Sequence, residues 1–228
     1  KTFGVKDFFS HNKTTFNQRW IRYIYLANKI INFDLDKDNC VWLDIGSYYG
    51  GLQSIIKKYK PKWRIALVDF HHQLCRSYIY LKTEFPETKH ILPDEIENFN
   101  SLKELPKGSF IYIPVSDYSK ISNMNVNLFT NFFSFGEMRK EVFLNYIKSD
   151  VYENSEITYL VNRFVSAPFF EKTYDSQLNI IDYLSLKRNL QYFDIFPIHY
   201  YFVNKRLILN RKFYRNLSSP YFEMVTVK

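Results

Sequence analysis

The sequence predicts an α/β fold in which a mostly parallel sheet has helices on both faces. Short, almost continuously apolar segments alternate along the chain with segments whose apolar residues recur at helical spacing. Strands that are apolar throughout are typical of parallel strands, because both of their faces are buried. The last two apolar segments have no helical segment between them. They therefore predict an antiparallel pair that closes one edge of the sheet.

The first predicted element is a helix over residues 15–31. Thr15 can cap this helix, with Gln18 three residues later. Its inward face is expected at positions that recur at helical spacing: Trp20, Tyr23, Ile24, Ala27 and Ile31. The segments that follow alternate between the two element types: strand 40–45, helix 51–59, strand 63–70 and helix 73–85.

The second half of the chain continues the alternation up to a closing strand pair. The expected elements are strands 109–115 and 126–132, helix 134–149, strand 156–162, helix 176–190, and the closing strands 199–203 and 221–227. We expect a single domain over residues 1–228. Within it we distinguish three parts: an N-terminal helical segment 1–39, a core 40–165, and a segment 166–228 that closes the sheet.

Composition favours a folded, basic protein. Of the 228 residues, 46% are hydrophobic, which argues against disorder, and the net charge of +8 favours anionic partners. Two isolated cysteines, Cys40 and Cys75, form neither a disulfide framework nor a zinc set, so a reducing cytoplasm is expected. No apolar run reaches transmembrane length.

The stretch VWLDIGSYYGG, residues 41–51, contains three of the six glycines. It lies at a predicted strand-to-helix turn, where α/β sheets bind ligands. A dinucleotide site would require G-x-G-x-x-G, but Tyr48 stands in place of the second glycine, and the Gly-Lys-Ser/Thr end of a P-loop is absent. Asp44, two residues before Gly46, would repel a pyrophosphate and would suit the cationic end of an amino acid.

This pattern resembles D-x-G-x-x-x-G, the first motif of class I S-adenosylmethionine-dependent methyltransferases. The resemblance extends to Asp69, which ends the second strand 25 residues after Asp44 and would accept hydrogen bonds from the ribose hydroxyls of the cofactor. It implies a Rossmann-like fold with a seven-stranded sheet and S-adenosylmethionine as the cofactor. The residues it implies as cofactor contacts are Asp44, Gly46, Ser47, Tyr48, Gly50, Asp69, Phe70 and Asn131.

A narrower resemblance covers roughly residues 40–165. The segments LVDF, YLKTEFPE, NLFTNFFSFGEM and YLVNR are similar to those of the sugar O-methyltransferases of bacterial surface-polysaccharide clusters. One departure is Phe70-His71-His72, where that family often has a proline, which affects the expected shape of the loop. The resemblance implies methyl transfer to a hydroxyl of a sugar, a nucleotide-sugar or a glycan. No His, Asp and Glu cluster has metal-ligand spacing, so a metal-independent reaction is expected.

Candidate acceptor-side residues follow the later strands, and each has a structural alternative. Glu137 could be a general base, and Ser134 could bind the acceptor; alternatively, the two form an S-x-x-E capping box. Arg163 could bind an acidic group or form a surface ion pair. His199 could be a base or a hydrogen-bonded core histidine. Asn131 could face either the cofactor or the acceptor.

Two other functions remain open from the sequence. An RNA or cap methyltransferase is favoured by the net charge and by the basic, aromatic C-terminal segment. A non-catalytic Rossmann-like partner subunit is favoured by Tyr48 in the glycine loop. Within residues 203–219, a basic insertion between the closing strands could attract an anionic acceptor.

Overall fold

The structure is a computed structural model of the whole chain. It describes residues 9–12, 14–96, 99–166, 177–198, 204–208, 211–215 and 219–228. Within these residues, no helix is both long enough and apolar enough to cross a membrane.

The central sheet has eight strands in the order β11-β14-β8-β7-β3-β4-β6-β5. All neighbours pair in parallel except β14, which is antiparallel to both β8 and β11. This confirms the mostly parallel sheet with an antiparallel closing pair. The strands are β3 (Val41–Ile45), β4 (Arg64–Asp69), β5 (His90–Ile91), β6 (Phe110–Pro114), β7 (Leu128–Phe132), β8 (Ile157–Arg163), β11 (Asn189–Ile195) and β14 (Tyr221–Val227).

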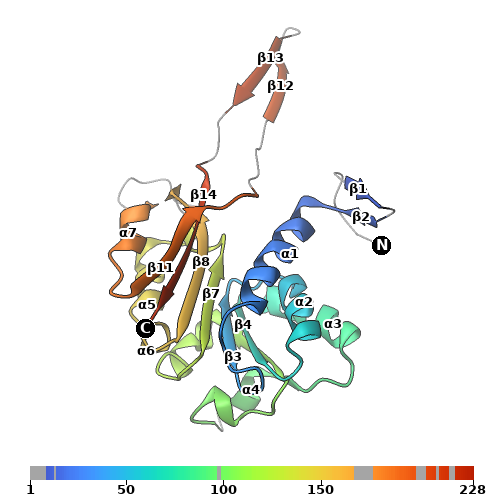
Figure 1. Cartoon of the computed structure of the whole chain (residues 1–228), viewed down its shortest axis with the longest axis vertical. Coiled ribbons are helices and arrows are strands. Elements are labelled where there is room, and N and C mark those ends of the chain that lie inside the picture. Colours follow the sequence, from blue (N-terminus) through green and yellow to red (C-terminus); the bar gives the residue numbers. More distant parts are fainter. Residues whose placement is uncertain are drawn as a thin grey trace.

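Helices cover both faces of this sheet (Figure 1). On one face lie α1 (Gln18–Ile31), α2 (Gly51–Tyr59) and α3 (His71–Glu84). The other face is covered by α5 (Lys140–Ile147), α6 (Asp150–Glu153) and α7 (Ile180–Leu184), together with the short α4 (Pro93–Ile96). Each face therefore has a hydrophobic core of its own.

Alternate residues of each central strand belong to these two cores. In β3, Trp42 packs in the core under α1 to α3, whereas Leu43 and Ile45 pack in the core on the α5 side. All five residues of β3 are buried. The strand is apolar almost throughout because both of its faces are covered, which is why it can be recognised from the sequence.

Smaller elements surround the sheet. Among the described residues, three two-stranded antiparallel ribbons pair β1 (Phe9–His11) with β2 (Thr14–Phe16), β9 (Val165–Ser166) with β10 (Leu178–Asn179), and β12 (Asn204–Ile208) with β13 (Arg211–Arg215). Three 3₁₀ helices are η1 (Leu102–Glu104), η2 (Val115–Lys120) and η3 (Phe135–Glu137).

Helix α1 starts later than predicted. Asn17, and not Thr15, caps it by accepting a 3.0 Å hydrogen bond from the backbone N–H of Trp20, because Thr15 is already paired in β2. Of the predicted inward positions, Ala27 is buried and Tyr23 and Ile31 pack against the core, whereas Ile24 is 56% exposed. The other buried residues of the helix, which were not predicted, are Arg22, Leu26 and Ile30.

The helix predicted over residues 134–149 is interrupted. It begins as η3 and resumes as α5 only at Lys140, with Met138 extended between them. Side chains on the strand ends account for the break, because Asn131 accepts a hydrogen bond from the backbone N–H of Phe135, and Asn162 accepts one from Gly136. These contacts hold the chain against the sheet, where an uninterrupted helix could not lie.

The closing strand pair was predicted at the wrong place. The strand that pairs with β14 is β11, whereas residues 189–190 were expected in a helix over 176–190 and residues 199–203 were expected to be the partner strand. Of residues 177–190, which the structure describes, only the five residues of α7 are helical. Strand β11 pairs with the edge of β14 that β8 leaves free. This tertiary pairing outweighs the helical spacing of the apolar residues in the local sequence. Residues 199–203 themselves lie outside the described residues.

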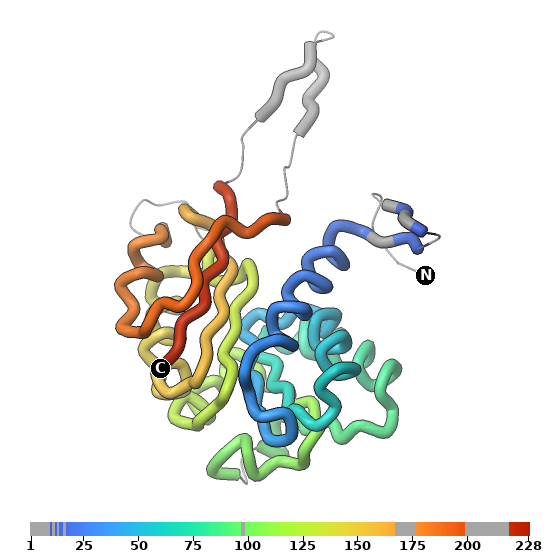
Figure 2. Tube along the Cα trace, in the orientation of Figure 1, coloured from blue at the N-terminus to red at the C-terminus, as the bar shows by residue number. Residues whose placement is uncertain are grey.

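Figure 2 shows one end of the strand order of the central sheet, where the C-terminal strand β14 (red) lies between β8 (yellow) and β11 (orange). The predicted seven strands become eight because the two-residue β5 adds to the edge beside β6. Strand β5 is too short to be recognised from its sequence.

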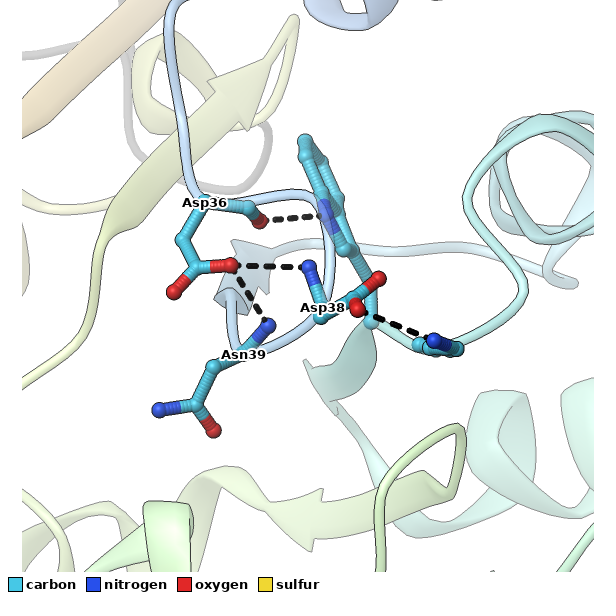
Figure 3. Close-up of polar contacts among 5 residues, drawn as sticks. Asp36, Asp38 and Asn39 are labelled. Atoms are coloured by element: carbon cyan, nitrogen blue, oxygen red, sulfur yellow. Dashed lines mark hydrogen bonds and ion pairs between the residues drawn. The ribbon is translucent and has the colours of Figure 1, made fainter.

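A tight turn leads from the end of α1 into β3. Figure 3 shows Asp36 accepting hydrogen bonds from the backbone N–H groups of Asp38 and Asn39, at 2.8 and 3.1 Å. The indole N–H of Trp63 bonds to the carbonyl of Asp36 at 3.0 Å. This turn therefore links the segment before β3 to Trp63, the residue before β4, and the two strands pair in parallel from Val41 with Arg64 onward. Both cysteines are free thiols, Cys40 buried and Cys75 exposed.

Candidate active site

The glycine loop lies at the carboxyl end of β3 and leads into α2. Gly46 and Gly50 have φ angles of +75° and +89°, which residues with side chains rarely adopt. A Cβ on Gly46 would also collide with the side chain of Ser134, and a Cβ on Gly50 would lie 2.8 Å from Leu81. The crowding of glycines in this stretch therefore follows from both backbone conformation and close packing.

Tyr48 also has a left-handed backbone, with φ of 55°. Its N–H donates a 2.8 Å hydrogen bond to Asp69, and its carbonyl accepts a 2.5 Å bond from Ser77. A second aromatic residue, Phe133, has φ of 71°. Strained residues of this kind persist only where surrounding contacts hold them, and they concentrate at functional sites.

Asp44 is a buried carboxyl held by two side chains. Its two oxygens accept hydrogen bonds from Gln53 Nε2 and Thr130 Oγ1, both at 2.5 Å. Thr130 in turn accepts a 2.7 Å bond from the indole N–H of Trp42. Burial raises the pKa of Asp44 to about 8, with a smaller contribution from the charge of Asp69 and with both hydrogen bonds opposing the shift. This carboxyl is therefore mostly protonated near neutral pH.

Asp69 ends β4 and fixes the glycine loop. One of its oxygens accepts from the N–H of Tyr48, and the other accepts a 2.7 Å bond from the N–H of Phe70. Burial raises its pKa, and the two backbone hydrogen bonds oppose that shift. Because a carboxylate can accept about four hydrogen bonds, Asp69 keeps capacity for a ligand.

Two cavities open beside the glycine loop. The larger, of about 720 Å³, is lined by Asp69 and Phe70 together with Val115 and Tyr146. The smaller, of about 400 Å³, is lined by Asp44 and residues of α1, α2 and β8. Four residues line both: Gly46, Tyr48, Ser134 and Glu137. The cavities therefore meet above the carboxyl end of β3, where ligands of such sheets bind.

The lining of the two cavities fits the two ends of S-adenosylmethionine. Ser47 and Gln53 are buried and line the smaller cavity, yet Ser47 Oγ and Gln53 Oε1 have no hydrogen-bond partner in the part of the chain that the structure describes. Buried polar atoms rarely stay unpaired, so these two suit the polar end of an amino acid. In the larger cavity, Asp69 and its apolar neighbours suit a nucleoside.

Asn131 lies behind the wall of the cavities and has no exposed surface. Its amide nitrogen donates to the carbonyl of Ile45 at 2.9 Å and to Ser134 Oγ at 2.6 Å. Its amide oxygen accepts from Phe135 N and Asn162 Nδ2, both at 3.0 Å. With these four contacts Asn131 ties the ends of three strands together and orients Ser134.

Glu137 stands where the two cavities meet. Ser134 makes no capping hydrogen bond with its side chain at the start of η3, so the capping box expected as the alternative does not form. Glu137 is an exposed residue that lines both cavities. Partial desolvation raises the pKa of its carboxyl, while the positive charge of Arg163 acts in the opposite direction.

Three arginines line the smaller cavity, and only Arg163 was expected from the sequence. Arg22 lies over the ring of Phe133, with 4.6 Å between its guanidinium carbon and the ring centroid, and Arg19 lies 4.7 Å from the centroid of Tyr48. Both come from α1, where Arg22 occupies a buried position four residues before Leu26. An arginine on the core face of an amphipathic helix is the signal that could have identified it.

Two sequence predictions concern residues that the structure describes partly or not at all. His199 lies outside the described residues. For the basic insertion, the backbones of β12 and β13 pair from Asn204 with Arg215 to Ile208 with Arg211. Among the described residues, no group of three or more His, Cys, Asp and Glu side chains could hold a metal ion.

Comparison with known proteins finds solved structures of similar fold but no relative by sequence. No family model and no curated protein matches the sequence. Among solved structures, a Bacillus halodurans protein assigned as a methyltransferase superposes with a TM-score of 0.54 at 9% identity, covering 90% of this chain and 97% of its own. The methyltransferase domain of bacterial CtHen1 gives 0.51 at 12% identity over 92% and 98%.

The mitomycin 7-O-methyltransferase MmcR also gives a TM-score of 0.51, at 7% identity over 92% of this chain, which spans 56% of that longer protein. Identities this low establish shared architecture and do not transfer substrates. The strand order and the antiparallel β14 agree with that architecture. The chain therefore has the fold of the class I methyltransferases.

Proposed function

We propose that this protein transfers a methyl group from S-adenosylmethionine to a hydroxyl group of a sugar-containing acceptor, without a metal ion. The observation that carries the proposal is the meeting of two cavities at Gly46, Tyr48, Ser134 and Glu137. One cavity suits a nucleoside, and the other is lined by polar and aromatic side chains. A methyl donor that extends through both cavities would place its methyl group near their junction, where an acceptor that enters the smaller cavity would meet it beside Glu137, the only carboxyl among the described residues that borders both.

The residues that would hold the cofactor are those at the ends of β3 and β4. Asp69 would accept hydrogen bonds from the ribose hydroxyls, and Phe70 would pack against the nucleoside. Ser47 Oγ and Gln53 Oε1 would gain the partners that they lack in the protein alone. Arg19, which lies against Tyr48, would pair with the carboxylate of the cofactor.

When bound, S-adenosylmethionine supplies an electrophilic methyl group on a sulfonium centre. A sugar hydroxyl is a weak nucleophile, so a general base improves the reaction. Glu137 has the placement and the raised pKa for this role, and we propose that its carboxylate takes the hydroxyl proton. Ser134, held in place by Asn131, would orient the acceptor. Holding the reacting atoms close and aligned supplies much of the remaining rate.

The acceptor class is proposed from the cavity and from the family resemblance. The smaller cavity has a volume of about 400 Å³, and because the amino-acid end of the cofactor would occupy part of it, the remaining space suits an acceptor group no larger than a monosaccharide unit. Tyr48, Phe133 and Tyr221 contribute aromatic surface to its lining. The sequence resemblance to sugar O-methyltransferases points in the same direction.

An RNA acceptor is the second candidate, favoured by the net charge of +8. Salt dependence separates the two, because binding through a phosphate backbone weakens steeply as salt is added. A non-catalytic partner subunit is the third reading, and titration calorimetry with S-adenosylhomocysteine tests it directly. A folded protein that binds neither S-adenosylhomocysteine nor S-adenosylmethionine would contradict the proposed function.

The acceptor itself is identified by mass spectrometry of surface glycans from cells with and without the gene. We expect one sugar to be unmethylated when the gene is absent, so that its mass is lower by one CH₂. Complementation with wild type should restore it, and complementation with Glu137→Gln should restore little of it. An unchanged glycan profile, together with methylation of RNA by the purified protein, would favour the RNA reading.

A further inference from the structure

Tyr146 is a buried tyrosine whose hydroxyl lacks a partner. It lies in α5 and lines the larger cavity, although only 3% of its surface is exposed. Its backbone carbonyl accepts a 2.5 Å hydrogen bond from Ser149 Oγ, whereas its hydroxyl forms no hydrogen bond to the part of the chain that the structure describes. Polar groups of buried side chains are nearly always paired. An unpaired hydroxyl on a residue that lines a cavity therefore points to a ligand that supplies the partner.

A second tyrosine in the same aromatic cluster provides a comparison. The ring of Tyr118 meets that of Tyr146 edge-on, with 4.6 Å between the ring centroids, and the ring of Phe135 lies 5.8 Å from it on the same measure. These neighbours hold the ring of Tyr146 in place. The hydroxyl of Tyr118 lies 2.8 Å from Ser149 Oγ and is paired within the protein, and Tyr118 is not among the described residues that line either cavity. Only Tyr146 thus combines an unpaired hydroxyl with a place at the cavity.

Asp69 lies near enough to Tyr146 for its charge to act on the hydroxyl. Burial, and to a smaller extent the negative charge of Asp69, raises the pKa of Tyr146 to about 12. The hydroxyl therefore keeps its proton at neutral pH and can donate a hydrogen bond. Asp69 lines the same cavity and is assigned to the ribose hydroxyls. A nucleoside held by Asp69 would consequently lie next to the hydroxyl of Tyr146.

Apolar side chains form the cavity lining around this hydroxyl. Val142 lies one helical turn before Tyr146 on α5, and it lines the larger cavity together with Val115 and Met138. In sites of this kind the apolar walls hold the ligand, and a few polar groups fix its orientation. A purine ring suits such walls, and its ring nitrogens accept hydrogen bonds at the edge of the ring. The hydroxyl of Tyr146 is a donor of the kind that such a nitrogen requires.

From this arrangement we infer that Tyr146 is a specificity-determining residue for the cofactor, whose hydroxyl donates a hydrogen bond to a ring nitrogen of the adenine. The inference rests on the proposed function and adds a contact to the base to the ribose contact assigned to Asp69. Because its ring is packed against Tyr118 and Phe135, Tyr146 presents the donor at a fixed position. A base without an acceptor at that position would leave the hydroxyl unpaired, which lowers affinity.

Two substitutions of the same kind test this role, with melting temperature and calorimetry as readouts. Tyr146→Phe removes an unpaired hydroxyl, so it should leave the melting temperature unchanged or higher while S-adenosylhomocysteine binds about three- to tenfold more weakly. Tyr118→Phe is the matched control and removes a hydroxyl that is paired with Ser149. It should lower the melting temperature and keep the affinity within about twofold. A merely structural role for Tyr146 would instead lower its melting temperature as well.

Analogues of S-adenosylhomocysteine identify the atom that accepts the bond. In three of them one ring nitrogen of the adenine, N1, N3 or N7, is replaced by CH, and in a fourth the ribose lacks its 2′-hydroxyl. We expect one of the three base analogues to bind wild type and Tyr146→Phe with equal affinity, because the partner of the hydroxyl is then missing from both complexes. The other two base analogues should still distinguish the two proteins.

Three results would overturn the inference. One is wild-type affinity for S-adenosylhomocysteine in a folded Tyr146→Phe protein. Another is a loss of affinity that comes with a melting temperature lowered as far as in Tyr118→Phe, which makes the role structural. A third is a loss that persists with all three base analogues and disappears with the 2′-deoxy analogue, which assigns the hydroxyl to the ribose. All three leave the cofactor site standing, whereas failure of the wild type to bind S-adenosylhomocysteine would count against the proposed function itself.

Discussion

The two halves of the candidate site are built in different ways. The proposed cofactor half consists of residues close together in sequence, from Asp44 to Gln53, with Asp69 one strand later. The proposed acceptor half gathers Arg22, Glu137 and Arg163 from elements far apart along the chain. The first half is rich in glycine and contains two aspartates, whereas the second contains two arginines and aromatic neighbours.

This difference shows which constraints act on each half. The cofactor half depends on backbone conformation at a strand-to-helix turn, so its requirements appear locally, as glycines and an aspartate at fixed spacing. The acceptor half depends on where α1 and the strand ends meet. The spacing of residues in the sequence does not show where α1 and the strand ends come together. A different acceptor could be accommodated by changing a few side chains without altering the strand-to-helix turn.

The largest expected effect is that of Gly46→Ala. The left-handed backbone strains any residue with a Cβ, by about 1–3 kcal/mol, and the new methyl group would collide with Ser134. We expect binding of S-adenosylhomocysteine to fall below detection by calorimetry, because the loop must move.

Gly108→Ala is the matched control for that variant. Gly108 also has a positive φ, of +77°, and a Cβ there would lie 2.7 Å from the carbonyl of Pro61, at the amino end of the sheet. It should lower the melting temperature but leave the affinity for S-adenosylhomocysteine within about twofold. Equal loss of affinity in both variants would show that the glycine loop has no special part in binding.

The next largest effect is expected for Asp69→Ala. Hydrogen bonds to a charged group contribute about 1.5–3 kcal/mol, so affinity for S-adenosylhomocysteine should fall by about 10- to 150-fold. Asp38→Ala removes a comparable carboxylate from an exposed pair with Lys62 and should leave affinity unchanged. Unchanged affinity in a folded Asp69→Ala protein would refute the ribose assignment.

A smaller effect concerns the proton on Asp44. With a pKa of about 8, this carboxyl is mostly protonated at pH 7, and a cationic amino group bound nearby would favour its ionised form. Binding of S-adenosylhomocysteine at pH 7 should therefore release up to about one proton. Calorimetry in buffers of different ionisation enthalpy measures the release, and Asp44→Asn should abolish it.

Stability in the absence of ligand gives an independent check on Asp44. Its pKa is raised above the unfolded value near 3.8, so the folded protein holds the proton more tightly. The contribution of this group to stability is therefore largest below about pH 4 and declines as the pH rises toward 8. Asp44→Asn should flatten that part of the decline, and identical pH profiles for the two proteins would contradict the raised pKa.

The smallest expected effect is that of neutralising the basic insertion. Changing Arg211, Lys212 and Arg215 together to Gln should raise the KM for the acceptor about two- to threefold at low salt, because the segment would attract an anionic acceptor over a distance. Added salt should remove the difference, and cofactor affinity should not change. Wild-type KM at low salt would show that the segment takes no part in recognition.

Much of the fold could be predicted because buried parallel strands are nearly continuous apolar runs. This was so for β3, β4, β6, β7 and β8. Strand β11 was missed because it lies at an edge with most residues exposed, so its pattern is weak and a pairing with β14 decides its structure. The interruption between η3 and α5 was missed because it depends on hydrogen bonds that two strand-end side chains accept: Asn131, at the end of β7, from Phe135 N, and Asn162, 26 residues away on β8, from Gly136 N.

The candidate site divides in the same way. Asp44, Gly46 and Asp69 could be chosen because the motif that contains them resembles that of class I methyltransferases, and the structure places all three in the lining of the cavities. Gln53 and Arg22 could not, because on a helix they look like ordinary polar residues until the neighbouring elements enclose them. The general base role of Glu137 and any role of His199 remain predictions.

The NMR signal of the Trp42 indole can report on the protonation of this site. Its N–H bonds to Thr130, which bonds in turn to Asp44, so the three groups form one chain through the core. Loss of the Asp44 proton strengthens the pull on the Thr130 hydroxyl, and hydrogen bonds in such chains polarise one another. In ¹⁵N-labelled protein, the ¹H–¹⁵N signal of this indole would therefore follow the protonation of the carboxyl as the cofactor binds.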